Sequence, residues 1–344
     1  MKRRGFLQLL AGVAVPSTTV RAADDDASAP SGPFSFALVG EMFDASEGVA
    51  EAERLIAGIG QSGVRFIVDV GAFKSSLERC SDSLFTERAA LLNASTVPLV
   101  AVAADNEWTG CDQPKEGAFD PYERLEALRQ QIFATSQSLG VNPMSLARQS
   151  GMRQFRTFSE NTRWQLDRVL FITLDVPSPN NDYRLGAGRN GEFEDRVIAN
   201  REWLERAFHY ASSLRFSGVA IAIEADPEFK RPLRPPDHRS PRRDGFYELK
   251  LTLRDLAAKF HGEVVLMHAA GSSGFLIDQP LSDASGKVVR NFTRIAAFAA
   301  PPDKRWLEVR VDTRTPRVFS VRPRRLEDLV APPEAPDTEP RGQT

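Results

Sequence analysis

Polar side chains of this 344-residue chain stand directly after short apolar runs, at positions where a β-strand would end. They are Glu41, Asp105, Asn106, Glu107, Glu224, Asp226 and His268. Ligands of α/β proteins bind beyond the carboxyl ends of the strands, so we expect these side chains to approach one another at one site. Carboxylate and amide oxygens, combined with an imidazole nitrogen, are donor types that bind divalent metal ions.

Apolar runs alternate with helical spacing along the chain, and this alternation predicts one α/β domain over residues 34–322. The expected strands are Phe34–Val39 and residues 65–70, 97–102, 169–174, 219–224, 264–268, 306–311 and 317–321. The expected helices are residues 50–59, 83–93, 120–138, 194–214 and 245–260. The last two strands should pair as an antiparallel hairpin, which indicates a mixed sheet or a second sheet.

The order of these strands and loops resembles the calcineurin-like metallophosphoesterases, and more narrowly an exported bacterial subgroup of them. The resembling segments are residues 34–41, 105–111, 160–164, 170–174, 180–181, 199–208, 225–227 and 291–294, together with His268. The resemblance implies a layered β-sandwich of mixed sheets flanked by helices. It also implies phosphoester hydrolysis at two divalent metals, where a metal-bound water or hydroxide attacks the phosphorus.

The positions that hold the metals in that family carry other residues here. Glu41 stands for the first acidic ligand, and Phe43 replaces the imidazole expected two residues later. Ala72 stands where the bridging aspartate is expected, and Ser272 replaces a second imidazole after His268. One imidazole, one amide and one carboxylate without a bridge make a poor two-metal site. We therefore expect an impaired or inactive hydrolase that acts as a binding or scaffold protein.

A remodelled, active phosphoesterase is the second hypothesis. Its candidate metal ligands are Glu41, Asn106 and His268, for Mn, Fe or Zn, and Glu224 or Asp226 would replace a lost ligand. Its candidate catalytic residues are Glu107 and His268. The structural alternative is that His268 is a hydrogen-bonded core residue and that residues 105–108 form a packed turn, in which case no metal binds.

A third hypothesis rests on the basic stretch 230–243, which has six Lys and Arg residues against the single acid Asp237. It would make the protein an extracytoplasmic module for a phosphorylated or other anionic small molecule. Its candidate ligand-binding residues are Asp105, Glu224, Asp226, Arg242 and Arg243. The alternative is a solvated loop stiffened by its prolines.

Cys80 and Cys111 are the two cysteines of the chain. An exported protein meets oxidising conditions, so we predict a disulfide between them rather than two independent buried thiols. The bridge would join the loops after the second and third strands and stabilise the fold by roughly 3–4 kcal/mol.

The first 22 residues predict a cleavable signal peptide of the twin-arginine type. Arg3 and Arg4 precede an apolar stretch at 9–15, and small residues stand at the −3 and −1 positions of a cleavage site after Ala22. The apolar stretch is far shorter than the roughly 20 residues that span a bilayer. We therefore expect a periplasmic or secreted protein with no stable membrane insertion after cleavage.

Composition excludes a general nucleic-acid binder from these expectations. Loss of residues 1–22 would remove four of the 44 basic residues and none of the 46 acidic ones, which leaves a net charge of −6. Residues 23–33 are rich in Asp, Ala, Ser and Pro and predict a flexible leader. Residues 323–344 are rich in Pro and charge and predict a disordered tail.

Overall fold

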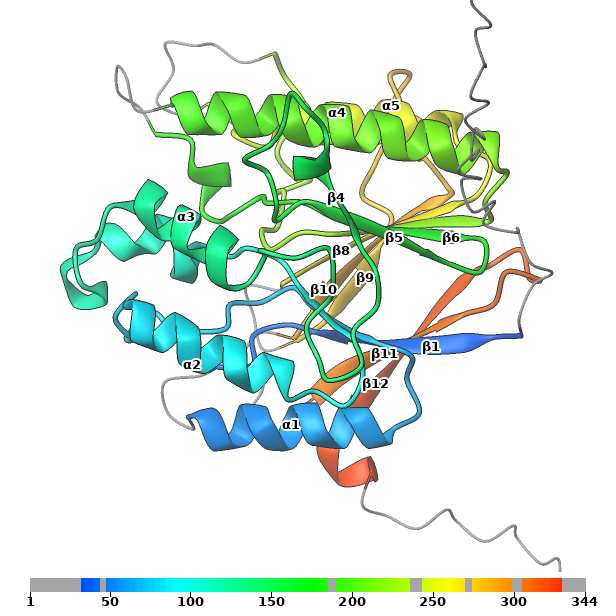
Figure 1. Cartoon of the computed structure of the whole chain (residues 1–344). Helices are drawn as coiled ribbons and strands as arrows, with labels where there is room; N and C mark the ends of the chain where they lie inside the picture. The colour runs from blue at the N-terminus through cyan, green and yellow to red at the C-terminus, as the bar shows by residue number, and fades with distance from the viewer. Residues whose placement is uncertain are drawn as a thin grey trace, which may run out of the picture.

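Two mixed β-sheets pack face to face in the computed structural model, which describes residues 32–43, 48–184, 190–235, 243–269, 274–298 and 305–329 (Figure 1). The first sheet has the order β12 (Phe319–Arg325), β11 (Arg305–Val311), β1 (Phe34–Val39), β2 (Ile67–Asp69) and β3 (Leu99–Ala101). The second has the order β4 (Ala147–Arg148), β5 (Thr162–Leu166), β6 (Val169–Thr173), β7 (Gly218–Ala222), β8 (Glu263–Ala269), β10 (Phe292–Ala297) and β9 (Leu276–Asp278).

Helices cover the outer face of each sheet, so the layers run α/β/β/α (Figure 1). The first sheet carries α1 (Val49–Gln61), α2 (Asp82–Asn93) and α3 (Pro121–Gln131), and the second carries α4 (Gly191–Ser213) and α5 (Tyr247–Lys259). Successive strand residues face opposite sides. In β1, Phe36 and Leu38 therefore face the other sheet, while Ala37 and Val39 contact the helices. This confirms the predicted layered sandwich of mixed sheets flanked by helices.

An aromatic cluster joins the two sheets at their centre. Phe36 and Phe66 stack with ring centroids 5.0 Å apart, and the edge of Phe66 meets Phe171 of the second sheet at 5.1 Å. Trp164 stacks on Phe171 at 5.1 Å. Aromatic pairs of this kind add about 0.5–1.5 kcal/mol each beyond the burial of their area. The cluster therefore holds the sheets in one relative position, and with them the loops at their ends.

Several elements differ from the sequence-based predictions. Helix α3 ends at Gln131 instead of residue 138, because Leu139 forms a backbone bridge with Leu99 and the intervening Ser/Thr-rich residues turn back to reach it. A second strand, β5, precedes the strand expected at 169–174. Asp167 adopts a left-handed conformation (φ 53°), and the turn there joins β5 and β6 in a hairpin. Strands β4, β9 and β10 were not predicted.

The chain also continues in regular structure past the predicted domain end at residue 322. Strand β12 runs to Arg325 and a 3-10 helix, Leu326–Leu329, follows. The proposed signal peptide, nearly all of the leader and the rest of the tail lie outside the described residues. Within the described residues, no helix combines the length and apolar character needed to cross a membrane.

The carboxyl ends of strands from both sheets meet at a point where only glycine fits. A Cβ atom on Gly71, just after β2, would overlap the backbone of Gly40 and Glu41, just after β1. A Cβ atom on Gly40 would overlap the carbonyl oxygen of Phe298, which follows β10 of the second sheet. The loops that leave these strands therefore begin in direct contact.

This contact predicts a large loss of stability on adding a single methyl group. Gly40→Ala and Gly71→Ala should each lower the free energy of unfolding by about 2–3 kcal/mol, because backbone atoms rather than flexible side chains must move. Urea unfolding followed by circular dichroism measures the loss. Gly151→Ala is the matched control, since nothing lies within 4 Å of its Cβ position. Equal midpoints for all three variants would contradict the close approach.

Candidate functional site

A cleft of about 480 Å³ opens beside this meeting point, at the carboxyl ends of the strands. Its lining residues are Glu41, Gly71, Ala72, Asp105, Asn106, Ser178, Pro179, Asn180, Glu224, Asp226, Glu228, Phe246 and Ala269. Five of these residues carry carboxyl groups and none is a lysine or arginine. A cavity of about 560 Å³ lies at the opposite strand ends, around Arg168, His261 and Thr313, and contains none of the predicted site residues.

The structure brings five predicted site residues into this cleft. Glu41 follows β1, Asp105 and Asn106 belong to the 3-10 turn after β3, and Glu224 and Asp226 follow β7. They come from both sheets, as expected for strands whose carboxyl ends converge. Their proposed roles as metal or ligand contacts stay predictions.

A serine hydroxyl joins two of the carboxyl groups. Ser178 Oγ lies 2.9 Å from Asp105 Oδ2 and 3.1 Å from Glu224 Oε1, and the Ser178 backbone N–H donates to Glu224 Oε2 at 2.6 Å. Burial raises the pKa of both carboxyl groups above their ordinary values. For Glu224 the pKa lies well above its ordinary value, and the charge of Asp105 raises it further.

The hydrogen count at this bridge favours a proton beyond that of the serine. A hydroxyl carries one hydrogen, so Ser178 can donate to only one of the two carboxylates at a time. The second short oxygen–oxygen contact then needs a hydrogen from a protonated carboxyl group. The geometry and the raised pKa of Glu224 both favour one proton held between Asp105 and Glu224. Paired carboxyl groups of this kind occur at sites of proton transfer and ligand binding.

The loop that carries Ser178 has an unusual backbone. Asn180, Asn181 and Asp182 all have positive φ angles, of 53°, 56° and 49°. Side-chain amides hold the turn: Asn180 Oδ1 accepts from the backbone N–H of Gly245 at 2.9 Å, and Asn181 Nδ2 donates to the Gly245 carbonyl at 3.0 Å. Sequence reasoning did not single out Ser178. The signal present was the run of turn-forming residues after β6.

Glu107, a predicted catalytic residue, does not line the cleft. Its side chain is fully buried, and Oε1 accepts backbone N–H groups of Phe73 at 2.7 Å and Lys74 at 3.2 Å. Oε2 accepts from the Ala104 N–H at 3.2 Å. Burial raises the pKa of Glu107 to about 8. The carboxyl group thus joins the loop after β2 to the loop after β3, which is a positioning task.

His268, predicted as both metal ligand and catalytic residue, is fully buried and is not among the cleft-lining residues. In β8 it shares the face of Val264 and Leu266, which pack in the core beneath α4 and α5. Its Nδ1 lies 2.6 Å from the Ala269 carbonyl, and Nε2 has no hydrogen-bond partner within the described part of the chain. Burial lowers the pKa of His268. Its placement is that of a core residue.

Of the replaced metal positions, the one held by Phe43 is filled by packing. The Phe43 ring is buried in the core beneath α1 and α2, with the Arg88 guanidinium 4.7 Å from its centroid. Ala72 lines the cleft and offers no donor atom. In the described ranges, one trio of His, Cys, Asp or Glu ligand atoms lies within 4.8 Å of one another, and it is Cys80, Cys111 and Glu116 outside the cleft. Ser272 lies outside the described residues.

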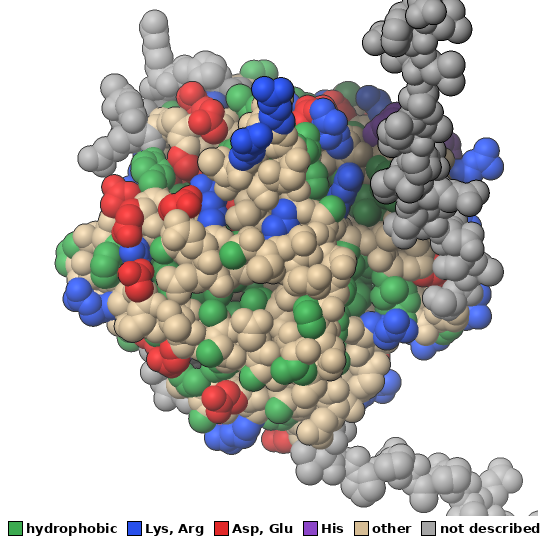
Figure 2. Space-filling view, in the orientation of Figure 1, with side chains coloured by type: hydrophobic (Ala, Val, Ile, Leu, Met, Phe, Trp, Pro, Cys, Tyr) green, Lys and Arg blue, Asp and Glu red, His purple; other side chains and the backbone are tan. Residues whose placement is uncertain are grey.

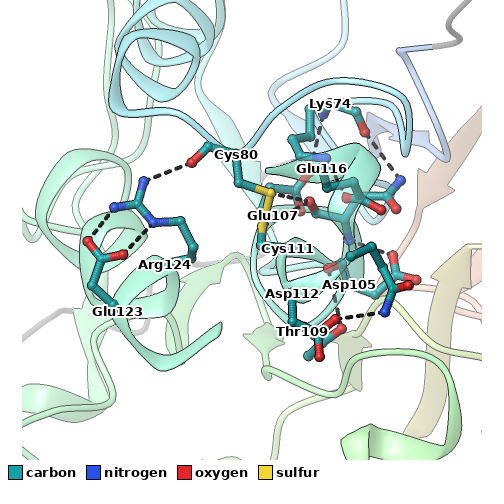
Figure 3. Close-up of a disulfide and its surroundings, with 12 residues drawn as sticks. Lys74, Cys80, Asp105, Glu107, Thr109, Cys111, Asp112, Glu116, Glu123 and Arg124 are labelled. Atoms are coloured by element: carbon teal, nitrogen blue, oxygen red, sulfur yellow. Dashed lines mark hydrogen bonds and ion pairs between the residues drawn. A yellow bond between two sulfur atoms is a disulfide. The ribbon is translucent and has the colours of Figure 1, made fainter. Parts of the chain in front are cut away.

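The predicted disulfide is confirmed. Cys80 and Cys111 are bonded, with their Cα atoms 5.8 Å apart, and the bridge joins the loop after β2 to the second 3-10 turn after β3 (Figure 3). Disulfides are typical of proteins outside the cytoplasm. Asn106 of the cleft lies directly beside the bridge, since its carbonyl oxygen is 3.5 Å from Cys80 Sγ.

The described residues of the basic stretch, 230–235 and Arg243, are not among the residues that line the cleft. Arg242 lies outside the described residues, and the Arg243 guanidinium lies over the rings of Tyr183, at 4.9 Å, and Phe193, at 5.6 Å. On the face shown in Figure 2, acidic and basic side chains are interspersed and form no continuous basic surface. The anionic-ligand hypothesis therefore stays a prediction.

Comparisons with known protein families and with curated proteins found no match. A solved structure described as "Structure of PhoD" aligns with 83% of this chain at a TM-score of 0.48 and 10% sequence identity. The alignment covers 65% of that chain, so the present chain spans less than two thirds of its length. A likeness at this level bears on neither the chemistry nor the ligand of the cleft.

The shared proton predicts how stability depends on pH. Because the pKa of Glu224 is raised in the folded protein, its ionisation opposes folding, and stability falls as pH rises above the ordinary range of a carboxyl group. In Glu224→Gln, the amide can donate to Ser178 Oγ while Ser178 donates to Asp105, so no shared proton is needed.

We expect the melting temperature of Glu224→Gln to exceed that of the parent by a few degrees at pH 8 and to converge with it near pH 4.5. Thermal unfolding across this pH range measures the difference. Glu228→Gln replaces an exposed acid on the same cleft and should leave the pH dependence unchanged. A pH-independent offset for Glu224→Gln would contradict the shared proton.

Proposed function

We propose that this chain is an exported protein with a phosphoesterase-like fold that binds a positively charged ligand and does not carry out two-metal phosphoester hydrolysis. The observation that carries the proposal is the composition of the cleft. Five carboxyl groups line it, and no lysine or arginine of the described part of the chain does. An anionic phosphoester alone would be repelled by these groups, whereas a cation would be attracted.

The positions of Phe43 and Ala72 support the loss of hydrolysis. Two-metal catalysis needs ligands that clamp both the attacking and the leaving oxygen. Phe43 is committed to the core, and Ala72 has no donor atom. Converting this site back to a two-metal centre would require at least these two side chains to change.

A divalent metal ion is the first candidate ligand. The acidic and amide residues that line the cleft are oxygen donors, and Glu41, Asp105 and Asn106 would hold the ion. Oxygen donors favour hard cations, so Mn fits better than Zn among the metals expected from the sequence. The carboxylates do not form a compact trio without it. Side chains must therefore move when the ion binds, which predicts modest affinity.

Titration calorimetry with Mn²⁺, together with hydrolysis assays on nitrophenyl phosphate mono- and diesters, tests the proposal. We expect saturable Mn²⁺ binding and no turnover above background. Glu41→Gln should weaken binding about tenfold, or ~1.4 kcal/mol, because it removes one charge from the cleft. Glu53→Gln, on the exposed face of α1, should have no effect.

Three outcomes separate the alternatives. Robust turnover that a chelator abolishes would overturn the proposal. Failure of Mn²⁺ to bind, together with saturable binding of a polyamine, would assign the cleft to an organic cation. His268→Ala should leave Mn²⁺ binding unchanged, since His268 does not line the cleft. Loss of binding in that variant would favour the remodelled site predicted from the sequence.

A remodelled hydrolase is the second candidate function, and the Asp105–Ser178–Glu224 bridge favours it. A carboxyl pair that shares a proton can act as general acid and general base. If such an enzyme acts on any nitrophenyl ester, Ser178→Ala should abolish the turnover. The control variant Gly151→Ala should retain the turnover of the parent. Turnover that persists in Ser178→Ala would exclude the bridge from the chemistry.

A further inference from the structure

The disulfide lies beside a buried acid. Cys80 Sγ, Cys111 Sγ and a carboxylate oxygen of Glu116 lie within 4.8 Å of one another, and all three residues are buried (Figure 3). The Asn106 carbonyl oxygen is 3.5 Å from Cys80 Sγ and 3.6 Å from Cys111 Sγ. Bonded sulfurs carry no hydrogen, so these are contacts rather than hydrogen bonds. Four donor atoms therefore surround one small volume.

This set matches the needs of a zinc-type ion once the sulfurs are separated. Such an ion binds four ligands, with Zn–S bonds of about 2.3 Å and Zn–O bonds of about 2.0–2.2 Å. Ligand atoms in a tetrahedral site of that size lie about 3.5–3.8 Å apart. Two cysteines and one glutamate can thus reach an ion by small movements, and the Asn106 carbonyl offers a fourth donor.

Charge balance supports the same exchange. Lys74 Nζ donates to Glu116 Oε2 at 2.8 Å, and both side chains are buried, so the pair is neutral beside the disulfide. Two buried thiolates would add two negative charges, which a buried site does not tolerate alone. A divalent ion cancels both charges. The site is therefore neutral as a disulfide and neutral again as a dithiolate with a bound dication.

The surrounding frame does not depend on the disulfide. The Cys80 N–H donates to the Glu116 carbonyl at 2.9 Å, and the Phe119 N–H donates to the Cys111 carbonyl at 2.8 Å. Arg124 Nη1 donates to the Cys80 carbonyl at 2.8 Å. These bonds fix both cysteine backbones from neighbouring loops and from α3, so the donors stay together when the bridge is reduced.

We propose that reduction converts the Cys80–Cys111 bridge into a binding site for a zinc-class divalent ion, with Glu116 as the third ligand. A dithiol or phosphine reductant supplies two electrons and breaks the S–S bond, which leaves two thiols. The ion then binds both sulfurs, and the two thiol protons pass to solvent. Disulfide and metal are alternative links between the same loops.

The exchange would act directly on the cleft, because Asn106 lies both beside the bridge and in the cleft lining. It also fits the predicted twin-arginine export, a route for proteins that are already folded. In the reducing cytoplasm the ion would hold these loops. After export, an external disulfide oxidant would accept the two electrons and be reduced to two thiols, the ion would be released, and the S–S bond would form in its place. The proposal does not depend on the ligand of the cleft.

Cobalt is the spectroscopic probe for this site. The full chain, produced in a reducing cytosol and kept in tris(2-carboxyethyl)phosphine, is titrated with Co²⁺. We expect one equivalent to give the thiolate-to-cobalt charge-transfer absorption and the visible bands of tetrahedral cobalt, and Zn²⁺ to displace it. The oxidised chain should give neither signal, since ions bound only by carboxylates lack the charge-transfer band. Zn²⁺ should also raise the melting temperature of the reduced chain and leave that of the oxidised chain unchanged.

Variants separate this site from incidental binding. Cys111→Ser should remove the charge-transfer absorption, and Glu116→Gln should weaken Co²⁺ binding at least about tenfold while retaining part of that absorption. Glu78→Gln is the matched control, a nearby acid paired with Arg88 rather than with the sulfurs. A reduced chain with native circular dichroism that takes up no cobalt would overturn the proposal. So would a reduced chain that stays unfolded with Zn²⁺ present, or an unchanged signal in Cys111→Ser.

Discussion

Contact between the strand ends of the two sheets determines where every loop of the cleft begins. Gly40 and Gly71 pass too close to each other, and to the Phe298 carbonyl, for a side chain to intervene. The aromatic cluster at the centre holds the sheets together, and the glycine contact sets the position of their carboxyl ends. Acids from β1, β3 and β7 consequently open into one shared cavity. The packing of the two sheets therefore sets the position of the cleft, and the side chains of the loops line it.

Burial of carboxyl groups is the electrostatic problem that this packing creates, and the structure handles it in three ways. Glu107 is surrounded by backbone N–H donors, and Glu116 is paired with Lys74. Asp105 and Glu224 each accept one backbone N–H and also share the Ser178 hydroxyl. Only this last pair faces the cleft.

The layers, the long helices and the gathering of acids could be predicted from local patterns, because each depends on residues close together in the chain. The Cys80–Cys111 bridge could be predicted because the chain has no other cysteine. The role of Ser178 could not, since its partners are 73 and 46 residues away. The burial of His268 away from the cleft lining could not be predicted either, because β8 is apolar on both faces and alternation alone does not tell which face meets the other sheet.

The left-handed turn at residues 180–182 has a consequence for how the adjoining side of the cleft binds a ligand. Three successive non-glycine residues in that region each cost about 1 kcal/mol or more, and the turn persists because Gly245 and buried Arg196 hold both asparagine side chains. Because these hydrogen bonds already constrain the turn, it has little conformational freedom left to lose. The turn would therefore lose little conformational entropy when a ligand binds beside it. The choice among ligands would then depend on their shape as much as on their charge. Because the turn is rigid, a bound molecule must adapt its own conformation to it.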